Sequence, residues 1–176
     1  MSTLHVLTVA DIDDPSIGEG CAVDQDAVHD FMKTTAKQIG IEFHEAGKLR
    51  EEDFALETIK TAVTGLSPAP DDIIVFHYSG HGFRSESKLS HWPAIALGHT
   101  FTGAIEGLDI DWIYQTLHEK NPRMLMVMVD CCNNTFEDYQ TEIHESRSKS
   151  FASPQRIAGL KTLFESFSGT VLGMGC

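Results

Sequence analysis

Five short hydrophobic segments divide the chain, and Gly, Pro, Asp or Asn residues bound them. Continuous apolar runs rich in β-branched residues are typical of strands that are buried on both faces of a parallel sheet. The second segment instead alternates apolar and polar residues, which is also a strand pattern. The expected strands are Leu4–Ala10, Ile41–Ala46, Asp71–Ser79, Arg123–Val129 and Gly169–Gly175.

Between these strands, apolar residues recur every three or four positions, which is the spacing of an amphipathic helix. In the first such segment Val23, Ala27 and Phe31 follow one another every four residues, Ala36 comes five residues later, and Gly40 supplies a stop signal. We therefore expect these four apolar residues to face the core. The expected helices are Val23–Gln38, Glu51–Val63, Leu108–Lys120 and Arg156–Phe167.

The remaining segments are predicted to be irregular. Residues 11–18 form a loop, residues 83–107 contain only short extended pieces, and residues 133–155 form a polar, flexible loop. Strands that alternate with helices predict a three-layer α/β/α sandwich with a mostly parallel central sheet and right-handed crossovers. We expect one such domain over residues 1–176.

The composition excludes several classes of protein. A net charge of −13 argues against a nucleic-acid binder, which needs a basic face. No apolar run approaches the roughly 20 residues that span a bilayer, and no secretory signal is expected at the amino terminus. The 4 cysteines include no C-x-x-C pair. Free thiols and a cytoplasmic location are therefore expected.

Reactive side chains follow two of the predicted strands. His81 and Gly82 come after the third strand, and Asp130 and Cys132 come after the fourth. The carboxyl ends of parallel strands meet at one edge of a sheet, so we expect a thiol and an imidazole side by side. The imidazole would favour the thiolate form of the cysteine and then pass a proton to a leaving amine.

The neighbours of these two residues suggest how a substrate would be held. The backbone N–H groups of Gly82 and Cys132 are candidate oxyanion donors. Asp130 lies two residues before Cys132 and therefore on the same face of an extended chain, whereas Cys131 faces the other way and is expected to be structural. A carboxylate beside the nucleophile could bind a basic substrate side chain.

Three motifs resemble those of the caspase-like cysteine proteases, above all the metacaspases and bacterial orthocaspases. They are His-Tyr-Ser-Gly-His-Gly at 77–82, Asp-Cys-Cys at 130–132 and Gly-Cys-Ala-Val-Asp at 20–24. Cys132 follows His81 by 51 residues, near the separation of roughly 50 in caspases. The caspase pattern Gln-Ala-Cys-x-Gly is absent from this sequence.

The resemblance implies a cysteine endopeptidase with His81 and Cys132 as its catalytic dyad. It also implies a pocket for the residue before the cleaved bond (S1) that contains Asp24, Ser79 and Asp130 and accepts Arg or Lys. In the order of the chain, the strands would be arranged 2-1-3-4-5. The family's sheet has a sixth strand, so a small subunit, a C-terminal portion or a partner chain would lie against residues 169–175.

The sequence also departs from the family pattern. Asn-Asn-Thr stands at 133–135 where metacaspases usually have His-Ser-Gly, and no acidic cluster of the kind used for calcium is evident in residues 83–107. We therefore expect no cofactor and no metal, and activation by calcium is the alternative. Arg147 and Lys149 lie in the polar loop, where an Arg/Lys-specific protease could cut itself. A linker that is never cut is the alternative.

Other interpretations of these residues remain open. His77, His81 and Cys132 could bind zinc, although their spacing matches no common zinc motif. The chain could also be an inactive scaffold or regulatory subunit that keeps the fold. His77 alone is typical of a satisfied core histidine, and Cys21 of a packing residue beside the site.

Several of the acidic and polar residues have simpler roles available. Asp24 could support the first turn of its helix through the helix dipole. Ser79 could only bond the backbone at its strand end. The aspartates of the first loop are expected to form a solvated turn, although they could also line the rim of a cleft for a basic substrate; they are Asp11, Asp13 and Asp14.

Overall fold

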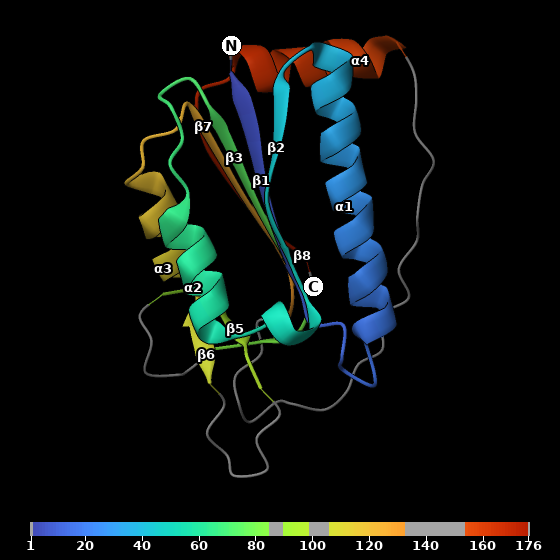
Figure 1. Ribbon diagram of the computed structural model, residues 1–176, viewed down its shortest axis with the longest axis vertical. Coiled ribbons are helices and arrows are strands. Elements are labelled where there is room, and N and C mark those ends of the chain that lie inside the picture. The colour runs from blue at the N-terminus through green and yellow to red at the C-terminus, as the bar shows by residue number, and fades with distance from the viewer. Residues whose placement is uncertain (1, 85–89, 99–105, 133–153, 176) are drawn as a thin grey trace.

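Five parallel strands form the central sheet of the computed structural model, which describes residues 2–84, 90–98, 106–132 and 154–175 (Figure 1). Every neighbouring pair in this sheet is parallel. The expected strand order is therefore confirmed. Across the sheet the strands are β2 (Glu42–Leu49), β1 (Thr3–Ala10), β3 (Ile73–Ser79), β7 (Met124–Asp130) and β8 (Gly169–Gly175).

Helices cover both faces of this sheet, so the three-layer α/β/α arrangement is also confirmed (Figure 1). On one face lie α1 (Gly18–Ile39) and α4 (Pro154–Lys161), which continues into a π-helical turn, η3 (Thr162–Ser166). On the other face lie α2 (Leu56–Gly65) and α3 (Ile110–His118). One continuous helix was expected from Glu51. The structure instead has a short 3-10 turn, η1 (Glu51–Asp53), which residues 54–55 separate from α2.

Side chains alternate between the two faces of each strand and fill two separate cores. The larger core joins Phe76, Tyr78 and Val127 of the sheet to α2 and α3. The smaller core joins Val75 and Met126 to α1 and η3, and so lies on the opposite face. Because Ser79, Asp130 and Cys132 continue the series that begins with Val75 and Met126, their side chains are expected on the α1 face.

The buried face of α1 differs from the predicted one. Val23, Ala27 and Phe31 are exposed, and only Ala36 of the four expected residues is buried. The buried face of α1 instead includes polar residues, and some side chains of the sheet that face α1 are polar too. A search for apolar spacing alone therefore selects the wrong face. The buried residues of α1 are Gly18, Cys21, Gln25, His29, Met32, Thr35, Ala36 and Ile39.

A second, three-stranded sheet lies in the region expected to be irregular. It consists of β4 (Gly82–Phe83), β5 (Ala94–Ala96) and β6 (Gly107–Asp109), paired in the order β4-β5-β6. The short extended pieces are thus confirmed, but their pairing into a sheet was not predicted. This small sheet begins directly after His81, so it fixes the path of the chain as it leaves β3.

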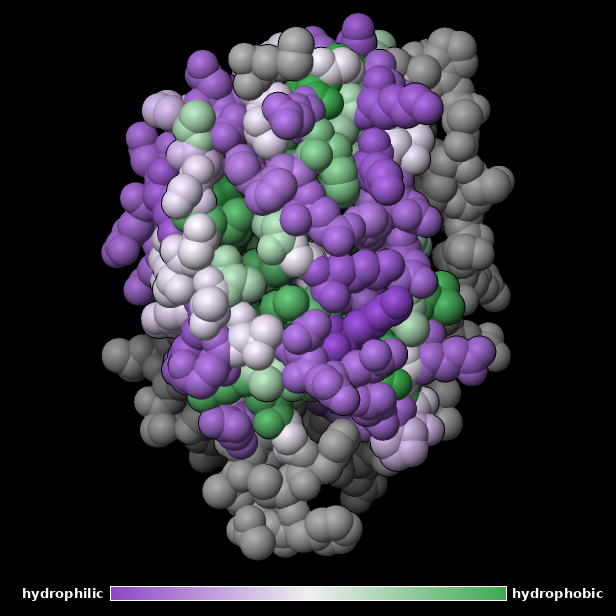
Figure 2. Space-filling view, in the orientation of Figure 1, coloured by the Kyte–Doolittle hydropathy of each residue, from purple (hydrophilic) through white to green (hydrophobic). Residues whose placement is uncertain are grey.

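The two edges of the central sheet are unlike each other. The edge strand β2 exposes Glu42, His44 and Glu45, and Figure 2 shows many hydrophilic residues on the α1 side of this view, with hydrophobic ones among them toward α2. The opposite edge strand, β8, has the sequence Gly-Thr-Val-Leu-Gly-Met-Gly and carries no charge. Charged side chains protect an edge strand from pairing with another chain. In this respect only β2, of these two edges, is protected.

Candidate active site

His81 and Cys132 follow neighbouring strands at the same edge of the sheet. The last paired residues of β3 and β7 are Ser79 and Asp130, and the N–H of Gly80 donates to the carbonyl of Asp130 (3.1 Å). The two chain segments then stay in contact, because a Cβ added to Gly82 would lie 2.6 Å from the carbonyl oxygen of Cys132. The structure thus brings together the segments that carry the imidazole and the thiol.

The backbone of His81 is held by hydrogen bonds to its carbonyl oxygen. The hydroxyl of Tyr78 donates to it at 2.7 Å, and the N–H of Ala96 in β5 donates at 3.0 Å. Tyr78 is itself fully buried, and its ring stacks on Phe54 with 6.3 Å between the ring centroids. The larger core therefore determines where the backbone of His81 lies.

The side chain of His81 contacts a carboxylate that the sequence analysis did not assign. Its Nε2 lies 3.1 Å from Oδ2 of Asp14, and the imidazole is 20% exposed. The expectation of a solvated turn is wrong for Asp11 and Asp14, which are buried, and fits Asp13, which is exposed. One local signal for Asp14 exists, since Asp-Pro-Ser favours a turn in which the carboxylate bonds the following backbone.

The loop around Asp14 stabilises its ionised form. Burial acts to raise the pKa of Asp14, but hydrogen bonds from Ser16 and Ile17, together with the charge of His81, outweigh it and lower the pKa to about 2. Asp14 is therefore a carboxylate at neutral pH, in direct contact with the candidate base.

A second acidic group lies on the α1 face of the same edge. Burial and the charge of Asp130 raise the pKa of Asp24, while a hydrogen bond with Ser79 opposes them. Burial also raises the pKa of the Cys21 thiol to about 11, and the charges of Asp11, Asp24 and Asp130 add to this effect. The three residues predicted for the S1 pocket are thus brought together, and Cys21 and Asp11 lie beside them.

The simpler roles considered for two of these residues fit less well. α1 begins at Gly18, so Asp24 lies beyond its first turn, where the helix dipole acts most strongly. The Ser79 hydroxyl interacts with the side chains of Cys21 and Asp24 instead of only with the backbone.

The two cysteines after β7 have different surroundings. Cys131 is buried and belongs to the larger core, on the α2 and α3 face. Cys132 is partly exposed. No disulfide joins any two of the described cysteines, which are Cys21, Cys131 and Cys132. Their arrangement agrees with a structural Cys131 and an accessible Cys132.

The pairing of β4 with β5 determines the direction of the Gly82 N–H, a predicted oxyanion donor. The carbonyl of His81 accepts from Ala96, so these two residues form a hydrogen-bonded pair of the β4–β5 ladder. Such pairs alternate with non-hydrogen-bonded ones, and the next pair is Gly82 with Ile95. The N–H of Gly82 therefore faces away from β5, toward the outer edge of β4.

The zinc interpretation gains no support from these positions. Among the described residues, no three His, Cys, Asp or Glu side chains gather as metal ligands would. His77 lies buried inside β3, and burial lowers its pKa to about 4, so it is neutral. Its Nδ1 has no hydrogen-bond partner within the described part of the chain, so the expected satisfied histidine is only half right.

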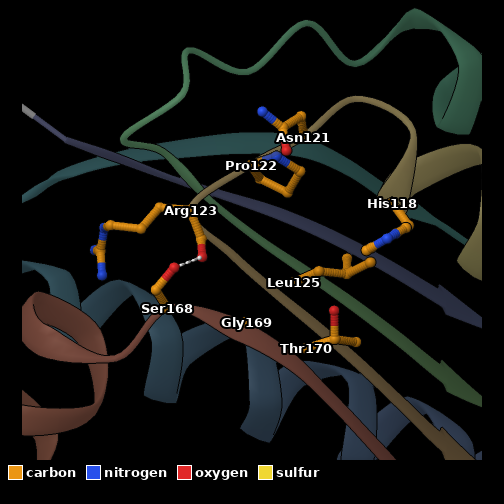
Figure 3. Close-up of a pocket in the computed structure, with 8 residues that line it drawn as sticks. All are labelled: His118, Asn121, Pro122, Arg123, Leu125, Ser168, Gly169 and Thr170. Atoms are coloured by element: carbon orange, nitrogen blue, oxygen red, sulfur yellow. Dashed lines mark hydrogen bonds between the residues drawn. The ribbon is translucent and has the colours of Figure 1, made fainter.

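A pocket of about 180 Å³ lies at the opposite end of the strands, where β7 and β8 begin (Figure 3). Among its lining residues are His118, Arg123 and Thr170. Arg123 turns its guanidinium away from the pocket and donates to the carbonyls of Phe164 and Phe167. Since His81 and Cys132 follow the carboxyl ends of their strands, this pocket is not part of the candidate active site.

Several predictions lie outside the described residues. These are the flexible loop, the self-cleavage sites Arg147 and Lys149, and the Asn-Asn-Thr sequence at 133–135. Within the described part of the chain, none of the helices has the length and apolar character needed to cross a membrane.

Comparison with known proteins adds a family to this geometry. The sequence model of a family described as "Caspase domain" matches residues 18–170, which is most of the chain. No curated protein matches the chain significantly. The matched range contains α1, both strand ends that carry His81 and Cys132, and the acidic group beside them.

Proposed function

This chain belongs to the caspase-domain family of cysteine peptidases, which act on protein substrates, and we propose that it is an endopeptidase that cleaves after Arg or Lys. Cys132 is the proposed nucleophile and His81 the proposed base. The observation that carries the specificity is the group of Asp24, Ser79 and Asp130 beside the two strand ends.

In the proposed reaction the Cys132 thiolate attacks the carbonyl carbon of the peptide bond and forms a tetrahedral intermediate. The N–H groups of Gly82 and Cys132 stabilise its oxyanion. His81, which has taken the thiol proton, gives it to the leaving amine, and a thioester remains on Cys132. Water then hydrolyses the thioester with His81 as base, and the free thiol returns.

The charge of the pocket supports the preference for a basic residue. Burial and repulsion from Asp130 disfavour the carboxylate form of Asp24. An Arg or Lys side chain would compensate both Asp24 and Asp130, whereas an acidic side chain would add to the repulsion. A neutral side chain would leave the partly buried Asp24 without a cation.

Matched peptides test this proposal. Fluorogenic substrates that differ only in the residue before the cleaved bond (Arg, Lys, Gln or Asp) should be cleaved only after Arg and Lys. Asp130→Asn should lower kcat/KM for Arg substrates by about tenfold to a hundredfold, with KM raised, since a charge partner is lost. Efficient cleavage after Asp, without cleavage after Arg, would refute the specificity.

A thiol-reactive peptidyl-Arg probe separates this proposal from the alternative of an inactive scaffold or regulatory subunit. The probe should label Cys132 in the wild-type chain. It should label no cysteine of the Cys132→Ala variant. A folded wild-type chain that resists the probe would favour the scaffold.

Three further features belong to the proposal. Metacaspase or orthocaspase type, with activity independent of calcium and of other cofactors, rests on the sequence motifs alone. Self-cleavage after Arg147 or Lys149 and a cytoplasmic location rest on the sequence as well. A partner strand beside β8, from a small subunit, a second copy or a further portion of chain, is supported by the uncharged sequence of that edge.

A further inference from the structure

We infer that Asp14 is a positioning residue that completes an Asp14–His81–Cys132 triad, where the sequence analysis predicted only a dyad. The inference deepens the proposed function and rests on it. It arises from the contact between Asp14 Oδ2 and His81 Nε2 at 3.1 Å, which joins residues 67 positions apart in the chain.

The two oxygens of the Asp14 carboxylate have different tasks. Oδ1 accepts hydrogen bonds from the backbone N–H of Ser16 (2.7 Å), the hydroxyl of Ser16 (2.5 Å) and the backbone N–H of Ile17 (3.0 Å). These bonds fix the plane of the carboxylate. Oδ2 contacts His81. One oxygen therefore anchors the side chain, and the other meets the imidazole.

The loop that carries Asp14 is itself fixed between α1 and β3. Asp14 accepts the N–H of Gly18 at 2.9 Å through its carbonyl, and the N–H of Asp11 donates to the carbonyl of Ser79 at 3.1 Å. Gly18 packs so closely that an added Cβ would lie 2.1 Å from the carbonyl oxygen of Ile12. The Asp14 side chain is 6% exposed. The contacts of the loop with α1 and β3 therefore fix the position of the Asp14 side chain.

This contact determines which nitrogen of His81 can act as the base. An ionised carboxylate only accepts hydrogen bonds, so the proton of neutral His81 must sit on Nε2. Nδ1 then carries the lone pair that accepts the proton of the Cys132 thiol. The resulting imidazolium carries positive charge against Asp14, which stabilises it without taking a proton itself.

Replacing Asp14 by Asn separates these tasks. The amide oxygen of Asn can still accept the bonds from Ser16 and Ile17, so the loop keeps its anchor. The amide nitrogen would meet Nε2 of His81 and cannot accept its proton. The wrong tautomer is then favoured, and the charge that supports the imidazolium is lost.

The test compares Asp14→Asn with the wild-type chain in three measurements. For a peptidyl-Arg substrate, kcat should fall by at least about a hundredfold, toward the roughly 10⁴-fold loss that the same change causes in a serine-protease triad, with KM within about threefold. Alkylation of Cys132 by iodoacetamide at pH 7, followed by peptide mapping, should slow by about tenfold or more, because less thiolate is present. The circular dichroism spectrum should stay unchanged.

Asp13→Asn is the matched control, since Asp13 is the exposed neighbour of Asp14 and the change in charge is identical. It should keep wild-type kcat and alkylation rate. The inference is overturned if Asp14→Asn also keeps both, or if Asp13→Asn loses them equally. A wild-type chain that cleaves no peptidyl-Arg substrate would refute the proposed function alone, because the alkylation rates would still decide the role of Asp14.

Discussion

The two adjacent cysteines at the end of β7 have different surroundings, which favour a packing role for one and the proposed catalytic role for the other. Cys131 is 4% exposed within the larger core, whereas Cys132 is partly exposed beside the segment that carries His81. If the alternation of β7 continues past Asp130, their side chains point in opposite directions. The same substitution at each position therefore tests different properties of the protein.

Cys132→Ala should abolish peptide hydrolysis, with a loss of several orders of magnitude in kcat, because no nucleophile remains. Cys131→Ala should keep most of the activity and lower the free energy of unfolding by about 1 kcal/mol, since it removes one buried sulfur. Activity assays and urea denaturation measure the two effects. An active Cys132→Ala together with a folded but inactive Cys131→Ala would reverse the assignment.

Asp24 is predicted to lower the stability of the protein while it serves specificity. Its pKa is raised, so the folded state binds a proton more readily than the unfolded state, and the ionised form is penalised at neutral pH. Asp24→Asn should raise the free energy of unfolding at pH 7 by roughly 0.5 kcal/mol, a small gain because the group is partly solvated. It should also lower kcat/KM for Arg substrates.

The gain from Asp24→Asn should fade as the pH falls through the raised pKa, since Asp24 is then protonated in the folded state. Asp26 on the same helix is the control of opposite sign. Its pKa is lowered by a hydrogen bond from Lys48 and by neighbouring charges, and Lys48 Nζ lies 2.7 Å from its carboxylate. Asp26→Asn should therefore lower stability at pH 7 and leave specificity unchanged. Equal effects of the two substitutions would contradict this account.

At the scale of elements, the strands were predictable because each is a continuous or alternating apolar run. The boundaries were less so: β2 continues to Leu49, beyond a shift in its register with β1 between Glu45 and Gly47. A Cβ on Gly47 would lie 2.8 Å from Leu7 Cδ1, so the glycine permits this close approach. Sequence patterns contain no information about that neighbour.

The buried face of α1 and the role of Asp14 depend on contacts between distant parts of the chain. Gln25 is buried because its side-chain amide donates to the carbonyl of Leu49 in β2, and Asp14 meets His81 only after β3 is in place. The positions of His81 and Cys132 could be predicted from the sequence, since each residue directly follows a predicted strand. The role of Asp14, the third member of the proposed triad, could not be predicted, because only the folded sheet brings Asp14 near His81.

Gly82 is the point where β4 packs against the end of β7, and the structure assigns it a packing role besides its N–H. An added Cβ would lie 2.6 Å from both Cys131 Sγ and the carbonyl oxygen of Cys132. Gly82→Ala should therefore push the two segments apart and lower kcat by about a hundredfold, as expected for misplaced reacting groups.

Gly159→Ala in α4 is the control, because an added Cβ there meets no atom within 4 Å. It should keep full activity and raise stability by about 0.5–1 kcal/mol, since alanine favours a helix over glycine. Measuring kcat for both variants tests whether Gly82 is needed for packing. Wild-type kcat in Gly82→Ala would show that the strand ends tolerate the extra atom.

For the whole molecule, the unprotected edge at β8 predicts association. An uncharged edge strand invites pairing with another strand, and Met174 is 37% exposed there. If a second copy or another chain pairs with β8, Met174→Lys should weaken the assembly by about tenfold in Kd, since a charge would be brought into the contact. Sedimentation of active protein measures the effect.

Phe31→Lys is the control for surface hydrophobicity, because Phe31 is 38% exposed on α1, away from β8. It should leave the assembly unchanged. Full activity from a monomer of the uncut chain would contradict both the partner strand and the need for self-cleavage. Intact mass measured on the same sample distinguishes cut from uncut protein.

The two faces of the central sheet support the proposed site in different ways. Cys131 anchors the end of β7 in the larger core, whereas Cys21 and Asp24 reach the site from α1, across the smaller core. Substitutions along α1 can therefore alter the charge of the pocket without moving the strand end that carries Cys132. Under the proposed function, a change of charge on α1 would shift the cleavage preference and leave the proposed chemistry at Cys132 in place.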